Sequence, residues 1–285
     1  MSDSEPKAKK SKQSGEGSSS KNEEQEVVID FVGRSPEEYD EAGITQLLVP
    51  LFHSSSVDIP ELVKLIIEQK HVGSVIKEDE NLEGGGGDDS DKEEDEDEDD
   101  DDNIFGLNTV IDLAKNKDLE CVKQIKKFIL SLAKDHSTDH STIESLLTSS
   151  PVGLVINERF INIPPQISVP LFESLSKEIK ESSEFSDFKY FIIFSKLFKP
   201  SKRKVKSKPE KGPTEDILWS NAEEELIDKE AEIKFEYPMN DEIDSAVGGN
   251  WLEKDESMIT YRRLLFFPAS KFNGVIEKIK SAFSS

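Results

Sequence analysis

The sequence has a single cysteine, Cys121, among its 285 residues. One cysteine excludes both an intramolecular disulfide and a zinc site built from cysteines, and it is typical of a reducing compartment, the cytosol or the nucleus. Apolar residues are also scarce, since hydrophobic residues make up 34% of the chain and charged residues another 34%. We therefore expect part of the chain to be disordered, because such a segment buries too little apolar surface to fold.

Long apolar runs and an excess of basic residues are missing as well. The N-terminal stretch MSDSEPKAKKSKQ has no apolar core and does not predict a secretory signal, and runs such as LLFF are too short to cross a bilayer. The chain has 36 Lys and Arg against 60 Asp and Glu, a formal net charge of -24. This imbalance favours a basic partner and disfavours a membrane or direct contact with nucleic acid.

The negative charge is concentrated in an acidic insertion, residues 78–102, in which four glycines form a flexible hinge before the acids. We call its last fifteen residues the acidic tract; they hold thirteen acids and one lysine, which is half the net charge of the chain. The acids, which we predict to bind a basic client, are Asp88, Asp89, Asp91, Glu93, Glu94, Asp95, Glu96, Asp97, Glu98, Asp99, Asp100, Asp101 and Asp102.

A second insertion, residues 200–213, is basic. Its import cluster, as we call it, consists of Lys202, Arg203, Lys204 and Lys206. Such a cluster indicates either nucleic-acid binding or a nuclear import signal. We favour import, because no aromatic residues lie between the charges to stack on bases.

Apolar periodicity stops at both insertions and resumes after them. It predicts strands near 27–32, 72–77, 104–113, 151–157, 188–198, 231–237 and 259–267. It predicts helices near 44–52, 60–69, 119–132, 142–147, 171–179 and 269–283, with Asp58 and Asp118 as N-caps and residues 221–228 as a helix or a turn. The stretch Phe188 to Phe198, apolar on both faces, is typical of a central, doubly covered strand.

This order predicts an α/β fold with a mixed sheet flanked by helices. We expect residues 1–25 to form a disordered tail and residues 26–283 to form a single domain. Both insertions would leave that domain and return to it.

Other candidate sites are weaker. His136 and His140 have the spacing of two helical metal ligands, but the sequence DHSTDHST is typical of an interhelix loop and offers no third ligand. Cys121 lies among apolar residues at helical spacing, which favours a small core residue over a nucleophile.

The stretch PVGLVINERFINIPPQISVPL, residues 151–171, places a charged pair between two apolar runs. In one interpretation Glu158 and Arg159 form a strand-end ion pair or a surface contact, while Pro164 and Pro165 end the strand and start a helix. In the other, the charged pair marks a partner-binding edge.

The chain resembles the BCCIP family, nuclear proteins named for binding a breast-cancer susceptibility protein and a cyclin-dependent kinase inhibitor. The resemblance rests on HVGSVIK (71–77), IFGLNTVIDL (104–113) after the acidic tract, the stretch 151–171 just quoted, SNAEEELIDKEAEIKFEY (220–237) and GGNW (248–251). It implies a fold similar to GCN5-type N-acetyltransferases. It also implies a nuclear scaffold, chaperone or transport role. Fungal members escort a large-subunit ribosomal protein and support nuclear export of a cargo, and animal members are tied to DNA repair and cell-cycle control.

An acetyltransferase of that fold holds the pyrophosphate of acetyl-CoA on the backbone amides of a glycine-containing turn. The corresponding turn, Asn157 to Pro165, has no glycine and two prolines, so it favours neither close backbone approach nor amide donation. We therefore expect no acetyl-CoA turn, no cofactor and no enzyme. The expected function is that of a nuclear protein, shuttling to the cytoplasm, which binds a ribosomal protein and nuclear transport factors. The alternative is a nuclear adaptor with repair or cell-cycle partners.

Overall fold

The structure is a computed structural model that describes residues 31–53, 55–78, 103–183, 185, 187–200, 217–239 and 258–284. Its strands are β1 (Phe31–Arg34), β2 (Ser74–Glu78), β3 (Gly106–Asp112), β4 (Val152–Arg159), β5 (Tyr190–Pro200), β6 (Leu218–Trp219), β7 (Ile233–Pro238) and β8 (Met258–Pro268). Its helices are α1 (Glu41–Leu51), α2 (Ile59–Glu68), α3 (Glu120–His136), α4 (His140–Ser149), α5 (Ser168–Glu181), α6 (Glu224–Asp228) and α7 (Phe272–Phe283).

The strands join one eight-stranded sheet in the order β1-β2-β3-β4-β5-β8-β7, and β6 pairs with β5 beside this path. Neighbouring strands are antiparallel except for β4 and β5, which run parallel. This arrangement confirms the predicted mixed α/β architecture, although antiparallel pairs dominate the sheet.

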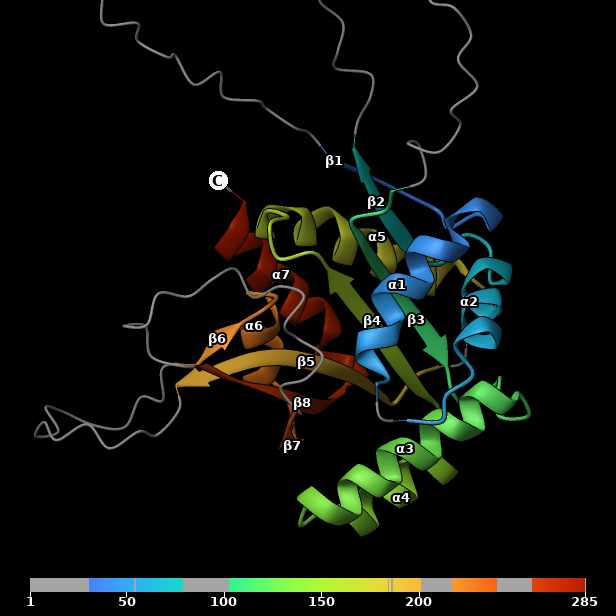
Figure 1. The fold of residues 1–285 in the computed structure, drawn as a ribbon, viewed down its shortest axis with the longest axis vertical. Helices are drawn as coiled ribbons and strands as arrows, with labels where there is room; N and C mark the ends of the chain where they lie inside the picture. The colour runs from blue at the N-terminus through green and yellow to red at the C-terminus, as the bar shows by residue number, and fades with distance from the viewer. Residues whose placement is uncertain are drawn as a thin grey trace, which may run out of the picture.

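Helices cover both faces of the sheet (Figure 1). Buried residues of α1 to α4 pack in one core with the inward side chains of one face, and those of α5, α6 and α7 pack in a second core on the other. β5 contributes to both, because Ile192 and Phe194 enter the first core while Phe191 and Ile193 enter the second. The prediction of a central, doubly covered strand is therefore confirmed.

Helix capping follows the sequence at α2 but not at α3. The Asp58 side chain accepts a hydrogen bond from the Glu61 amide at 3.0 Å, as an N-cap does. The predicted Asp118 cap is wrong, because α3 begins at Glu120 and Leu119 occupies its N-cap position without a side-chain cap. Instead, Glu61 of α2 accepts a hydrogen bond from the Cys121 amide at 2.5 Å. A tertiary contact thus provides the acceptor for a backbone amide in the first turn of α3, where the local sequence provides none.

The four long segments outside the described residues, 1–30, 79–102, 201–216 and 240–257, attach to one end of the sheet. Glu78, the last residue of β2, pairs with Phe31, and Gly106, the first residue of β3, pairs with Arg159 at the end of β4. Likewise Pro200, at the end of β5, pairs with Met258 at the start of β8. We call this the carboxyl end of the sheet, because β4 and β5 finish there.

The connections 79–102, 201–216 and 240–257 therefore each join two antiparallel neighbours at the carboxyl end. The acidic tract, the import cluster, GGNW and the N-terminal tail lie outside the described residues. None of the helices within the described ranges is long and apolar enough to cross a membrane.

Candidate functional site: a polar network where β4 and β5 separate

β4 and β5 separate towards the carboxyl end of the sheet. They pair only along Val152–Val155 and Tyr190–Ile193, although both strands continue beyond this point. β6 then takes the place beside β5, with Trp219 opposite Leu197. We call the place where β4 leaves β5 the β4–β5 split. The segment 217–228, which contains β6 and α6, fills it.

The filling segment is bonded to both strands. On the β5 side the Ser220 amide donates to the Lys196 carbonyl at 2.9 Å. On the β4 side the Asn221 side-chain amide donates to the Asn157 carbonyl at 2.8 Å. An asparagine side chain thus replaces the ladder hydrogen bond that β5 no longer supplies.

A third anchor comes from β8. Arg263 donates to Asp228 of α6 at 3.0 Å and to Glu236 of β7 at 2.7 Å. Its guanidinium also lies 5.4 Å from the centre of the Trp219 ring of β6, within cation–π range. One arginine therefore ties β6, α6 and β7 together.

Charged side chains fill the interior of the β4–β5 split. Arg159 forms a two-pronged ion pair with Glu223, with Nη2 and Oε2 2.8 Å apart. Asn157 donates from its Nδ2 to Oε1 of Glu223 and to Oε1 of Glu224, both at 2.9 Å. Asn221 donates to the same Glu224 oxygen at 3.0 Å. Both glutamates are fully buried, so these contacts form in a dry environment that strengthens them.

A second ion pair lies on the opposite face of the sheet. Successive strand residues alternate faces, so Glu158 points away from Asn157 and Arg159. Glu158 accepts a hydrogen bond from Nη1 of Arg262 at 2.9 Å, and Arg262 is only 2% exposed. Burial raises the pKa of nearby Tyr237 to about 12, partly offset by Arg262, so the phenol stays neutral.

The charges of the network balance when Glu224 is neutral. Burial, followed by repulsion from Glu223 and Glu158, raises the pKa of Glu224 to about 8. Burial opposes the charge of both arginines, but Glu223 raises the pKa of Arg159 and Glu158 raises that of Arg262. At neutral pH, Glu224 is therefore mostly protonated, and Arg159 and Arg262 keep their charge.

Four buried atoms in or beside the network have no hydrogen-bond partner among the described residues: Oδ1 of Asn221, Oε2 of Glu224, Nε of Arg262, and Oδ1 of Asn108, whose Nδ2 donates to Oδ1 of Asn157 at 3.1 Å. The rest of the network is paired internally, and it presents no exposed nucleophile or base. The network therefore links β4 to the segment 217–228.

Glu158 and Arg159 thus form ion pairs, but with distant partners and not as a surface pair. Their side chains are 15% and 4% exposed. Sequence reasoning did not identify Asn157, Glu223 or Arg262 as members of the same cluster. The single available signal was the polar run SNAEEELID, in which acids directly precede an apolar helix face.

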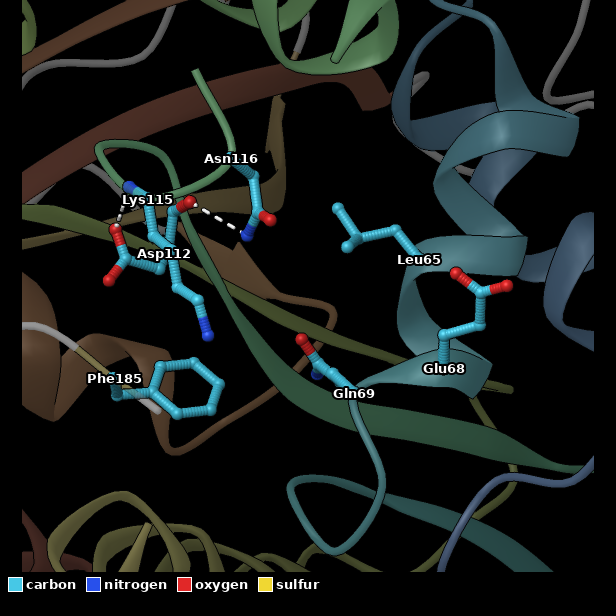
Figure 2. A pocket seen from close by; sticks show the side chains of 7 residues that line it. All are labelled: Leu65, Glu68, Gln69, Asp112, Lys115, Asn116 and Phe185. Carbon is cyan, nitrogen blue, oxygen red and sulfur yellow. Dashed lines mark hydrogen bonds between the residues drawn. The ribbon is translucent and has the colours of Figure 1, made fainter. Parts of the chain in front are cut away.

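A cavity of about 130 Å³ lies at the opposite end of the sheet, between α2 and the turn after β3 (Figure 2). Asp112 and Asn116 in its wall bond within their own turn: Asp112 accepts from the Lys115 amide at 2.8 Å, and Asn116 donates to the Asp112 carbonyl at 3.0 Å. Gln69 likewise donates to Thr109 at 2.7 Å. Asp112, Asn116 and Gln69 are thus engaged in hydrogen bonds within the fold.

The histidine pair flanks the connection between two helices, and the cysteine lies in the core. His136 ends α3 and His140 begins α4, and no group of three or more potential metal ligands exists within the residues the structure describes. Cys121 is buried in the first core, which confirms the predicted core role. Burial and then the Glu61 contact raise the pKa of its thiol to about 12, so it stays protonated.

The family model and the curated relatives agree on one family. The BCCIP family model matches residues 26–227. A BCCIP homolog from Drosophila melanogaster is 38% identical over 265 residues, covering 90% of this chain and 84% of the relative. The Homo sapiens protein named BRCA2 and CDKN1A-interacting protein is 32% identical over 271 residues, covering 92% and 83%. The crystal structure of BCP1 from Saccharomyces cerevisiae has a similar fold, with a TM-score of 0.56, 18% identity and 93% of both chains covered.

Proposed function

The chain belongs to the BCCIP family, and from this premise we propose that it is a non-enzymatic binding protein. It acts as a chaperone or escort for a basic client, with a large-subunit ribosomal protein as the client class. Its work serves ribosome biogenesis and nuclear export.

The turn after β4 supports the non-enzymatic part of the proposal. We propose that the sheet shares the architecture of GCN5-type N-acetyltransferases, a likeness supported by its single parallel pair and by the helix that follows β4. The turn after β4 does not suit a pyrophosphate. Its Phe160 amide donates to Phe105 and its Ile163 amide donates to Phe160, while two prolines have no amide hydrogen. Titration with acetyl-CoA by calorimetry should therefore show no heat of binding.

The charge distribution carries the client part of the proposal. The acidic tract holds half the net charge of the chain and joins β2 to β3, two paired strands at the carboxyl end of the sheet. A dense run of like charges attracts a basic protein from a distance, whereas selection of one partner by shape requires a folded surface. The tract therefore accelerates encounter with the client and shields it from RNA, and the folded domain selects it.

Stopped-flow association tests this division. Deleting Asp88 to Asp102 should slow association with a basic ribosomal protein at low salt and flatten the salt dependence, because salt screens charges over about 8 Å at physiological ionic strength. A matched variant keeps the length of the tract and changes each acid to its amide. Both variants should keep the circular dichroism spectrum of the wild type. Equal association rates for all three proteins at low salt would contradict the proposal and leave the tract a solubility segment.

The place of action is proposed to be the nucleus, with shuttling to the cytoplasm through nuclear transport factors. The import cluster supports this assignment, since it is a compact basic run in an acidic chain.

A second candidate function is a nuclear adaptor in DNA repair and cell-cycle control. The relatives named BRCA2 and CDKN1A-interacting protein support it. A pull-down from nuclear extract at low and high salt, read by mass spectrometry, separates the candidates. Ribosomal proteins lost at high salt favour the escort function, and repair or cell-cycle proteins favour the adaptor.

A further inference from the structure

A row of aromatic rings lines the carboxyl end of the sheet. Phe31 of β1 and Phe105, just before β3, contact edge to face with ring centres 5.5 Å apart. Phe105 and Phe160, the residue after β4, do the same at 6.5 Å. Ile161 follows and is 64% exposed, while Phe160 is 37% exposed. We call these four residues the aromatic rim.

Backbone hydrogen bonds fix the rim to the sheet. The Phe105 amide donates to Ile76 of β2 at 2.8 Å, and the Phe160 amide donates to the Phe105 carbonyl at 2.9 Å. Beneath the rim, Phe31 and Phe105 pack on a buried cluster of Ile76, Ile163 and Leu171. The rim is therefore a rigid apolar surface that loses little conformational entropy on binding.

The charged residue that precedes Phe160 turns away from this surface. Arg159 points inward to Glu223, so the first residue after β4 that faces outward is apolar. The turn does not depend on the exposed side chains of Phe160 and Ile161, because backbone hydrogen bonds and two prolines, Pro164 and Pro165, stabilise it. Exposed, adjacent apolar residues on a rigid support are typical of a contact surface.

We propose that the aromatic rim is the docking surface for the basic client, through a segment that combines Lys or Arg with apolar side chains. This inference rests on the proposed function and names the surface it uses.

Charge complementarity selects that occupant. Phe31 lies opposite Glu78, where the chain leaves for the acidic tract, and Phe105 is the third residue after Asp102, where the tract ends. A segment docked on the rim therefore lies at the same end of the sheet as both attachment points of the thirteen acids. A second copy of this chain would bring two such tracts together, and like charges at this density repel.

The rim and the tract then control different rates. Long-range attraction by the tract sets the association rate, whereas apolar contacts at the rim set the dissociation rate. Removing rim side chains should leave association nearly unchanged and shorten the lifetime of the complex.

Two synthetic peptides of equal charge test the proposal on the full-length chain. One alternates lysine pairs with leucine and tryptophan, and the other replaces those apolar residues by serine. The rim variant is Phe160→Ala with Ile161→Ser. The matched control is Val49→Ser, which removes an apolar side chain that is 47% exposed on α1.

The wild type and the Val49→Ser variant should bind the apolar basic peptide at least ten-fold more tightly than the serine peptide, through slower dissociation. The rim variant should bind both peptides equally, with an unchanged association rate. The variant with amides in place of the acids of the tract should bind both peptides more weakly than the wild type does. It should keep the difference in affinity between the two peptides.

Each contrary outcome has a distinct meaning. If neither basic peptide binds the wild type, the proposed function fails. If both bind and the rim variant keeps the preference for apolar residues, the function stands and the rim proposal is overturned. A wild type that dimerises in sedimentation velocity while the rim variant stays monomeric would assign the rim to a second copy, which also overturns it.

Discussion

Changing Glu224 to Gln should stabilise the protein more strongly as the pH rises. Glu224 is fully buried, and its pKa is raised to about 8 from an ordinary value of 4.5, first by burial and then by Glu223 and Glu158. Between these two values the folded state holds a proton that the unfolded state has lost. The wild type therefore loses stability as the pH rises through this window, by about 1.4 kcal/mol per pH unit and about 5 kcal/mol in total.

Glutamine removes this loss because it resembles the protonated acid. Its carbonyl can accept the hydrogen bonds that Asn157 and Asn221 donate to Oε1, and it has no proton to release. The variant should match the wild type near pH 5 and exceed its free energy of unfolding by about 3 kcal/mol near pH 7. Above about pH 8 the difference should level off, because both states of the wild type are then ionised.

Urea unfolding followed by circular dichroism at pH 5, 6, 7, 8 and 9 measures the difference. The control is Glu225→Gln, which removes an exposed acid one residue away, paired with Lys229 at 2.8 Å. Its effect should stay within about 1 kcal/mol at every pH, since exposed ion pairs contribute little. A Glu224→Gln difference that does not change with pH would refute the protonated state, and uniform destabilisation would refute the tolerance of the site for a neutral group.

Further predictions concern the other side chains of the fold. Arg159→Met should lower the free energy of unfolding by about 3–5 kcal/mol at pH 7, because it leaves Glu223 buried without its partner; a urea-derived loss below 1 kcal/mol would contradict this. Gly73→Ala should destabilise by more than about 1 kcal/mol, since φ is +104° there and a methyl group would meet Thr109. Gly274→Ala in α7, with open space around it, should instead stabilise by about 0.5–1 kcal/mol, and melting temperatures that shift alike would be inconsistent with both statements. Changing the import cluster to alanine should lower the nuclear fraction of a fluorescent fusion. The N-terminal Lys7, Lys9 and Lys10 form a second basic cluster, so a fraction unchanged after both clusters are neutralised would place the signal elsewhere or in a partner.

Local pattern predicted the elements whose stability is local or purely apolar. Asp58 and Pro60 predict the start of α2, because Asp58 is its N-cap and Pro60 lies in its first turn. The alternation of apolar and polar residues in β7 predicts that Phe235 and Tyr237 point inward. The stretch from Tyr190 to Phe194 is apolar on both faces, which predicts a strand with a core on each side. Each of these signals depends on neighbours in the chain, so periodicity detects it.

The elements that sequence reasoning missed depend on distant contacts. β6 has two residues and pairs with β5 where β4 no longer does. No local sequence pattern predicts this separation of β4 from β5. Asn157 and Glu223 are 66 residues apart, so their contact is invisible without the sheet order. Glu61 caps α3 from 60 residues away, which is why the Asp118 prediction failed. Polar partners are specified by tertiary geometry, whereas propensity describes each residue alone.

The hairpin position of the acidic connection has a consequence for how the family can vary. Ile76 and Gly106 are ladder partners, so the sheet already holds the two ends of the connection together. The entropy of closing such a loop grows only with the logarithm of its length, by about 0.6 kcal/mol for each doubling. Evolution or engineering can therefore lengthen, shorten or recharge this connection at almost constant stability. Under the proposed function, the attraction for a basic client could then change without a change in the folded domain.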